Sequence, residues 1–379
     1  MIEALGWVVL AFASLTTLCF LGNFLLFHKC GQSKDGSSLP SVSVLIPARD
    51  EAEVIRTSVE AVLANHGVNL EVVVLDDQSR DQTPEIVREL ARSDGRVRLI
   101  QGQALASGWC GKQYACGQLA EHARYDELLF IDADVRLRAN AIERCLAERQ
   151  RRGVDLLSGF PRQIVGTLGE ALLLPLMHIV LLTYLPFPLM RLTKLRSASA
   201  GCGQLFLTSR EAYRRSGGHG AIRLSMHDGV TLPRAYRHVG LKTDVVDASD
   251  LAACRMYHGW RETVDGLLKN AHEGIANRPL IVPFTAMMVM GYVAPILMVF
   301  LELSCDASTA TLQRVVVAAA ISYLPRILSA VRFDRAWYVV PLFPLSVLIF
   351  LMIQWLAFVR LCRGQPSTWR GRVYEPTTA

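Results

Sequence analysis

The chain has 379 residues, of which 51% are hydrophobic and 20% are charged. This composition excludes a disordered chain and is more apolar than that of an ordinary soluble enzyme. The formal net charge is +6, and Lys and Arg form no dense tract, which argues against nucleic acid as a partner. The nine cysteines are scattered, odd in number and without a C-x-x-C pair, which indicates a reducing compartment and no disulfide framework.

The chain begins with an apolar run, residues 5–27, that contains no charged residue and no histidine. This run is long enough to cross a bilayer. Glu3 precedes it, whereas His28 and Lys29 follow it, so the positive-inside rule places the N-terminus outside and the following chain in the cytosol. Because the basic front end and the cleavage site of a signal peptide are missing, we expect residues 1–30 to be a transmembrane anchor.

Short apolar runs then alternate with helical periodicity between about residues 41 and 152. In five segments the apolar residues are consecutive, as in parallel strands that are covered on both faces. These segments are 42–46, 70–75, 97–100, 128–131 and 154–157, with helices expected at 51–65, 84–93, 112–122 and 140–151. The repetition predicts a doubly wound α/β domain with a mostly parallel sheet, in which ligands bind beyond the carboxyl ends of the strands.

Acidic residues follow two of these strands. Asp76 and Asp77 end the second strand, and Asp132 and Asp134 follow the fourth. Two residues apart on an extended segment, Asp132 and Asp134 point to the same side, and they predict a Mg²⁺ or Mn²⁺ site, with a solvated turn as the alternative. The sequence contains neither a G-x-G-x-x-G after the first strand nor a G-x-x-x-x-G-K-[ST], which argues against a dinucleotide dehydrogenase and a P-loop NTPase.

With several further motifs, these segments resemble the membrane-bound family 2 glycosyltransferases over residues 41–277, and most of all their hopanoid- and carotenoid-associated subgroups. The motifs follow the family's order: VSVLIPARDE (42–51), VVVLDDQSRDQT (72–83), GWCGKQYA (108–115), FIDADV (130–135), SAGCGQLFL (199–207), GGH (217–219) and MHDGVTLPR (226–234). The resemblance implies a glycosyltransferase A-type fold. It also implies inverting, metal-dependent transfer of a sugar from a nucleotide-sugar donor, expected to be UDP-linked. We expect a membrane lipid as the acceptor, because apolar segments bracket the predicted site and an acceptor in the bilayer can then reach it.

The resemblance further implies a set of donor-binding residues: Pro47, Ala48, Arg49, Glu51, Asp77, Lys112, Asp132 and Lys269. Asp77 would accept a hydrogen bond from the nucleotide base, and a turn aspartate is the alternative. Glu51 would face the donor or cap the helix that it begins. Lys112 follows Gly111 at a helix start, where anions bind well, with a surface lysine as the alternative.

The same resemblance assigns the metal, the base and the acceptor side. Asp134 would hold Mg²⁺ or Mn²⁺, which neutralises a diphosphate leaving group, and Asp132 would contact either this metal or the ribose. Asp228 aligns with the catalytic base that deprotonates an acceptor hydroxyl, and a helix N-cap is the alternative. Many relatives carry two acids at this point, whereas here His227 takes the first place. The residues expected on the acceptor side are Gly203, Gln204 and His227.

One family motif is missing. Many processive relatives carry Q-x-x-R-W after the base, and this chain has no such string. Residues 259–270 stand in its place, with Lys269 as the cationic replacement, so the phosphate role of Lys269 is open. The departure argues against polymer synthesis. The rival hypotheses are a processive polysaccharide synthase, a nucleotidyltransferase and an inactive membrane scaffold.

A further apolar run, residues 171–190, contains three prolines. Asp134 and Asp228 must meet at one donor sugar, so a single membrane crossing between them is excluded. We therefore expect residues 171–196 to lie in the membrane interface, with Arg191, Lys194 and Arg196 suited to phospholipid head groups. A buried core helix is the alternative.

The last hundred residues contain three more apolar runs: 280–303, 315–331 and 337–359. The middle run is weakest, because it contains Pro325 and Arg326. Three spans would put the basic tail, 363–379, outside and against the charge rule, whereas two spans and an interfacial segment would put it inside. We expect a cytosolic domain at 40–278 and a transmembrane region at 279–362, in the plasma membrane of a bacterial-type cell.

Overall fold

The computed structural model describes residues 2–32, 39–304, 308–365, 367–369 and 372–374. Part of the predicted basic tail, Arg370 included, lies outside these residues. The chain divides into two compact units. The sheet unit comprises Phe27–Arg162 and Phe187–Met256, and the helical unit comprises Met1–Leu26, Gln163–Pro186 and Tyr257–Ala379. The predicted interfacial segment, 171–196, is therefore shared between them, and its role stays a prediction.

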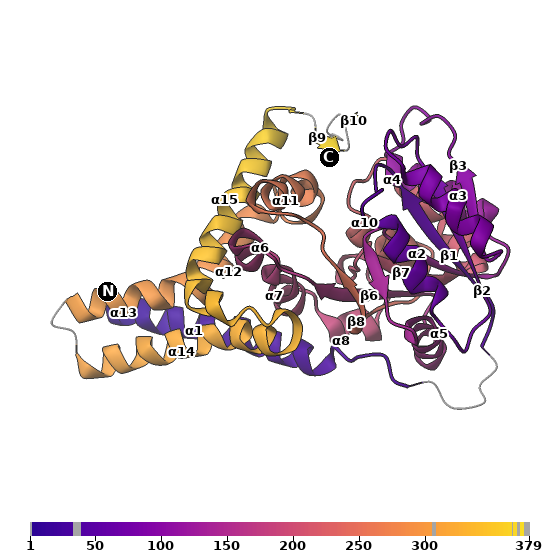
Figure 1. Ribbon diagram of the computed structural model, residues 1–379. Helices are drawn as coiled ribbons and strands as arrows, with labels where there is room; N and C mark the ends of the chain where they lie inside the picture. The colour runs from indigo at the N-terminus through magenta and orange to yellow at the C-terminus, as the bar shows by residue number, and fades with distance from the viewer. Residues whose placement is uncertain (1, 33–38, 305–307, 366, 370–371, 375–379) are drawn as a thin grey trace. The chain divides into compact units, whose positions relative to one another are not determined.

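The sheet unit is built on an eight-stranded mixed sheet with the order β3-β2-β1-β4-β7-β6-β8-β5 (Figure 1). The first four strands in the chain pair in parallel, and β7 runs antiparallel to both β4 and β6. The strands are β1 (Val42–Ala48), β2 (Leu70–Asp76), β3 (Val97–Gln101), β4 (Glu127–Ile131), β5 (Val135–Leu137), β6 (Leu156–Gln163), β7 (Leu205–Ser209) and β8 (Thr243–Cys254). The predicted α/β class is confirmed, and five of these strands begin within two residues of the predicted runs.

Alternate residues of the central strands face two different hydrophobic cores. Val44 and Ile46 of β1 lie in a core with α2 and α5, whereas Leu45 lies in a core with α4 and α10. Because both faces are covered, these strands have continuous apolar sequences. The helices of this unit are α2 (Ile55–Leu63), α3 (Thr83–Ser93), α4 (Gly111–His122), α5 (Ala141–Arg152), α8 (Phe187–Leu192), α9 (Arg210–Ser216), α10 (Asp228–His238) and the 3-10 turns η1 (Arg196–Ala198) and η2 (Gly218–Ile222).

The helical unit contains the apolar helices. Among the described residues, four helical stretches are long and apolar enough to cross a membrane: Glu3–Leu26, Ile281–Ser304, Thr309–Asp334 and Trp337–Cys362. They match the anchor and the three C-terminal runs expected from the sequence. The stretch Leu168–Tyr184 is also apolar but shorter. The weakest run retains its helix because Arg326, 3% exposed, pairs with Asp334 at 2.9 Å, so its charge is not presented to lipid.

The helical unit is assembled from three separate stretches of the chain. They are α1 (Ile2–Leu26), α6 (Leu168–Leu173), α7 (Pro175–Tyr184), α11 (Trp260–Gly274), α12 (Ile281–Met288), α13 (Ala294–Ser304), α14 (Thr309–Ser329), α15 (Phe343–Cys362), the π turns η3 (Val289–Val293) and η4 (Ala330–Asp334), the 3-10 turn η5 (Trp337–Leu342) and the short strands β9 (Ser367–Trp369) and β10 (Arg372–Tyr374). α1, α13 and α14 share one core, to which Val9, Met298 and Val315 contribute.

Candidate active site

Three segments of the sheet unit meet beyond the carboxyl end of β4. Asp132 follows β4, Lys112 is the second residue of α4, and Asp228 is the first residue of α10. The Nζ atom of Lys112 lies 2.6 Å from Asp132 Oδ1 and 2.9 Å from Asp228 Oδ2. The same ammonium donates to the carbonyl oxygen of Gly203 at 3.3 Å. Four residues predicted from separate motifs are thus brought together around one cation.

Two glycines let these segments approach one another. A Cβ atom on Gly203 would lie 2.1 Å from Asp228 Oδ1, and one on Gly229 would lie 2.7 Å from the carbonyl oxygen of Gly201. Gly201 N–H donates to the Gly229 carbonyl oxygen at 2.6 Å. The loop 201–204 therefore packs backbone against backbone on the start of α10, and it carries Asp228 to Lys112. Sequence reasoning identified Gly203 but missed this role of Gly201 and Gly229.

Burial and pairing set the ionisation of this cluster. Burial alone would lower the pKa of Lys112, but Asp132 and Asp228 outweigh it and hold this pKa well above its ordinary value. Burial raises the pKa of Asp132 to about 6, opposed by Lys112 and assisted by Asp134. For Asp228, burial is outweighed by Lys112, His219 and His227, and the pKa is lowered. Asp228 is therefore a carboxylate at neutral pH, the form that a general base requires.

Asp134 makes different contacts from Asp132. Its Oδ2 atom accepts a hydrogen bond from Cys254 Sγ at 3.1 Å, at the end of β8. Gln204 Nε2 donates to the same sulfur at 2.9 Å, so buried Gln204 supports Asp134 through Cys254. Burial, with Asp134 next, raises the pKa of the Cys254 thiol, which therefore keeps its proton and remains a donor. Nothing in the sequence marks Cys254 as a site residue, because its contact arises only when β8 joins the sheet.

Asp132 and Asp134 are the residues of the predicted metal site. No group of three His, Cys, Asp or Glu suited to a metal ion occurs within the described part of the chain. The protein would supply the carboxylates of Asp132 and Asp134, which are hard oxygen donors. Mg²⁺ is commonly held by one or two carboxylates and completes its shell with substrate phosphates and water. These two aspartates fit an ion of that kind bound together with a diphosphate.

The predicted base pocket lies at the ends of β1 and β2. Ala48 pairs with Asp76 across the two parallel strands, which places Pro47, Ala48 and Asp77 at one edge of the sheet. Arg49 Nη1 donates to the Asp77 carbonyl oxygen at 2.6 Å, and Asp77 N–H donates to the Ala48 carbonyl oxygen at 2.8 Å. The structure therefore brings these four predicted donor residues together.

Glu51 lies in the turn that leads from β1 to α2. Its N–H donates to Thr83 Oγ1 at 2.8 Å, and its carbonyl oxygen accepts from Val54 and Ile55. Asp50 before it has a φ of 54°, a left-handed conformation that aspartate tolerates better than most residues. The main chain of Glu51 thus starts the helical segment, while its role toward the donor stays a prediction.

The remaining predicted residues lie in three places. His227 immediately precedes α10, and its N–H donates to Ser225 Oγ at 3.0 Å. The GGH motif lies behind β4, where buried His219 contacts Phe130 and pairs through Nδ1 with Tyr213 Oη at 2.8 Å. Lys269 belongs to α11 of the helical unit. Its phosphate role stays a prediction.

Comparisons with known proteins agree with the motif reading. Residues 43–217 match the model of Glycosyl transferase family 2. A 4,4'-diaponeurosporenoate glycosyltransferase of Staphylococcus aureus (strain N315) is 26% identical, covering 97% of this chain and 98% of its own length. One of Staphylococcus haemolyticus is 27% identical over 69% of this chain and 70% of its own length. The structure of a mannosyltransferase from Pyrobaculum calidifontis in complex with GDP-Man and Mn²⁺ has a TM-score of 0.54 at 18% identity, covering 95% and 99% of the two chains. At 18% identity, the similarity between this chain and the mannosyltransferase is a similarity of fold.

Proposed function

We propose that this chain, a glycosyltransferase with a family 2 domain over residues 43–217, transfers a sugar from a nucleotide-sugar donor to a carotenoid-type lipid of the membrane. The observation that carries the proposal is the convergence of Asp132 and Asp228 on the Lys112 ammonium, at 2.6 and 2.9 Å. One cation between two carboxylates suits a site where an anionic leaving group departs next to a base. We expect a UDP-linked donor, and the mannosyltransferase of similar fold makes GDP-mannose the second donor to test.

On the donor side, Lys112 would bind the diphosphate. Its ammonium lies in the first turn of α4, where main-chain N–H groups add positive potential. A divalent ion held by Asp132 and Asp134 would neutralise the charge that develops on the leaving diphosphate. Asp77, with residues 47–49, would bind the base. When the diphosphate draws the ammonium of Lys112 toward it, the carboxylate of Asp228 becomes available to the acceptor.

On the acceptor side, Asp228 would take the proton of an acceptor hydroxyl as its oxygen attacks the anomeric carbon. Direct displacement of this kind inverts the anomeric centre. A carotenoid acid, the acceptor in the names of the Staphylococcus relatives, is already ionised at neutral pH and needs no base. For such an acceptor Asp228 would only orient Lys112. The dependence of turnover on Asp228 therefore distinguishes the two kinds of acceptor.

Membrane association follows from the four apolar helical stretches of the helical unit. We propose the plasma membrane of a bacterial-type cell as its location, with the sheet unit in the cytosol, where nucleotide sugars are made. An acceptor held in the bilayer would then need no soluble carrier.

The test uses the full-length protein in neutral detergent with UDP-glucose or GDP-mannose and a carotenoid acid or alcohol. The proposal expects a lipid with one sugar, seen by mass spectrometry, and equimolar release of nucleoside diphosphate. Release of pyrophosphate would indicate a nucleotidyltransferase, and a polymer would indicate a processive synthase. The variant Asp134→Asn, which removes a proposed metal ligand, should lose this transfer. Asp126→Asn is its matched control, because Asp126 is 91% exposed and pairs with Arg210 away from the site.

A further inference from the structure

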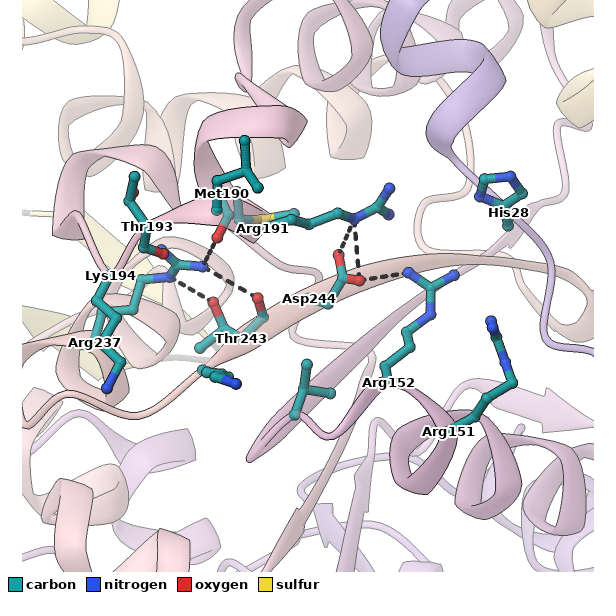
Figure 2. A pocket seen from close by; sticks show the side chains of 13 residues that line it. His28, Arg151, Arg152, Met190, Arg191, Thr193, Lys194, Arg237, Thr243 and Asp244 are labelled. Atoms are coloured by element: carbon teal, nitrogen blue, oxygen red, sulfur yellow. Dashed lines mark hydrogen bonds and ion pairs between the residues drawn. The ribbon is translucent and has the colours of Figure 1, made fainter.

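A second pocket of the sheet unit lies apart from the residues of the active site (Figure 2). Its volume is about 480 Å³. The side chains that line it come from the ends of α5 and α10, from α8 and the residues after it, from the start of β8, and from His28. These segments are far apart in the sequence, so the pocket exists only in the folded unit.

The lining of this pocket is strongly basic. Six cationic side chains face a single carboxylate, that of Asp244. Figure 2 shows Arg191 and Arg152 on either side of Asp244, and both form ion pairs with it. Glu148 also pairs with Arg151 and Arg152, which still leaves four cations in excess. The six are Arg151, Arg152, Arg191, Lys194, Arg237 and Lys242.

Part of this positive charge has no carboxylate to neutralise it. Arg237 is 3% exposed and donates to neutral oxygens: Thr243 Oγ1 at 2.8 Å and the Thr193 carbonyl at 2.9 Å. Lys194 and Lys242 are exposed and form no ion pair with any described residue. The Nη2 atom of Arg191 has no hydrogen-bond partner among the described residues. Because the N–H groups of Arg237 are all taken by protein oxygens, the donors available to an anion with several oxygens, such as a phosphate, are those of Lys194, Lys242 and Arg191.

The surroundings favour a phosphate that is attached to a lipid. Leu192 is 84% exposed and Leu195 51% exposed, and they alternate with the cations Arg191, Lys194 and Arg196. Apolar side chains interleaved with basic ones are typical of segments that lie on an anionic bilayer. One lining residue, His28, follows the last residue of α1, a membrane-spanning candidate, by two positions in the chain.

We infer that this pocket binds the phosphate head group of an anionic membrane phospholipid and so fixes the sheet unit on the bilayer surface. The inference does not depend on the proposed glycosyl transfer. Arg152 and Arg191, which Asp244 positions, would form the floor of the site, and Lys194 and Lys242 its entrance. The predicted interfacial segment would then end in a specific lipid contact and not only in a diffuse basic surface.

The test measures lipid binding to the full-length protein in neutral detergent by native mass spectrometry. Dioleoylphosphatidylglycerol should bind at least about tenfold more tightly than dioleoylphosphatidylcholine. The variant Lys194→Gln/Lys242→Gln should weaken phosphatidylglycerol binding about 30-fold, since each basic residue near an anionic head group contributes a factor of about five. These two side chains are exposed, so the variant should fold.

The matched control is Arg92→Gln/Arg136→Gln, which removes two exposed charges of the same unit outside the pocket and should leave binding unchanged. Equal binding of the two lipids, or an equal loss in the control variant, would overturn the inference. Competition by millimolar inorganic phosphate that removes all bound phosphatidylglycerol would show a site for free phosphate instead. Because the readout is lipid binding, its result is separate from that of the transfer assay.

Discussion

At the scale of single residues, the two carboxylates beside Lys112 differ in the direction of their pKa shifts. Burial would raise the pKa of both, yet Lys112 prevails only at Asp228, because Asp132 also faces the charge of Asp134. Asp228 is thereby kept ionised and suited to accept a proton. The pKa of Asp132 stays raised while the charge of Asp134 is not neutralised. A metal ion bound between the two carboxylates would remove this repulsion and displace any proton from Asp132.

The first prediction concerns Asp228→Asn. Turnover with a carotenoid alcohol should fall about 10²–10⁴-fold, the usual contribution of a positioned general base, with donor binding nearly unchanged. With a carotenoid acid the loss should be much smaller, because that acceptor is already ionised. His227→Ala should cost less than Asp228→Asn with the alcohol. Steady-state kinetics with both acceptors, together with melting temperatures, provide the measurement. Normal turnover with the alcohol at a reduced melting temperature would make Asp228 a structural residue.

The second prediction concerns Asp134→Asn, which removes a ligand charge at constant volume. Turnover in saturating Mg²⁺ or Mn²⁺ should fall at least about 100-fold, whereas the melting temperature should change little, since the amide can still accept from Cys254. The wild-type protein should lose activity in a chelator and regain it when the metal is restored. Undiminished turnover of the wild type in excess chelator would refute the metal assignment.

At the scale of elements, the sequence allows β6 and the parallel half of the sheet to be predicted, but not β5, β7 and β8. β1, β2 and β4 are buried on both faces, so their apolar runs stand out. β8 carries an acid at every third position from Asp244 to Asp250, and the ion-pair partners of Asp244, Arg152 and Arg191, lie far away in the sequence. The sequence of β8 is therefore too polar to be recognised as a buried strand, because the ion pairs with Arg152 of α5 and Arg191 of α8 form only in the folded unit.

The candidate site likewise has a part that the sequence predicts and a part that only tertiary packing creates. The motifs predict Asp132, Asp134 and Asp228 separately, each from its position at a strand end or helix start. The Lys112 bridge requires α4 to meet a loop about 90 residues later, and the contact of Cys254 requires β8 to pair with β5. Such contacts depend on tertiary packing, and no local pattern encodes them.

The third prediction tests the packing of the loop 201–204 against α10. Gly203→Ala would place a Cβ atom 2.1 Å from the Asp228 carboxylate and push it from Lys112. Turnover should fall about 10²-fold, since a shift of about 1 Å in a reacting group has that effect, while overpacking lowers stability by about 1–3 kcal/mol. Kinetics on protein shown to be folded by circular dichroism provide the measurement.

Gly117→Ala is the control for this variant. Gly117 lies inside α4, and a Cβ atom there would approach Trp109 no closer than 3.9 Å. This change should keep full activity and raise stability by about 0.5–1 kcal/mol, because alanine favours a helix over glycine. Full activity of Gly203→Ala as well would mean that the loop can move without disturbing Asp228.

At the scale of the whole molecule, the packing of the C-terminal helices bears on how many times the chain crosses the membrane. Figure 1 shows α1, α13 and α14 side by side, whereas α15 runs at a steep angle to them. α11, whose first turn contains Arg261 and Glu262, packs along α15 and on α6. A helix covered by an amphipathic neighbour is not surrounded by lipid. Although α15 is apolar enough to cross, we expect it to lie at the membrane surface, with α11 on its polar side.

The fourth prediction follows from this packing. With α1, the stretch Ile281–Ser304 and α14 as the spans and α15 at the surface, the chain crosses the membrane three times, so its two ends lie on opposite sides. Arg360 and Arg363 then lie in the cytosol, as the positive-inside rule requires. Alkaline phosphatase fused before Met1 should be active outside the cell, and a fluorescent protein fused after Ala379 should fluoresce in the cytosol. A tag near Arg152 should be cytosolic too, as should one near Asp35, which lies outside the described residues. Active phosphatase at the C-terminus would show that α15 crosses as a fourth span, and an external tag at Arg152 would place the sheet unit away from its nucleotide-sugar donor.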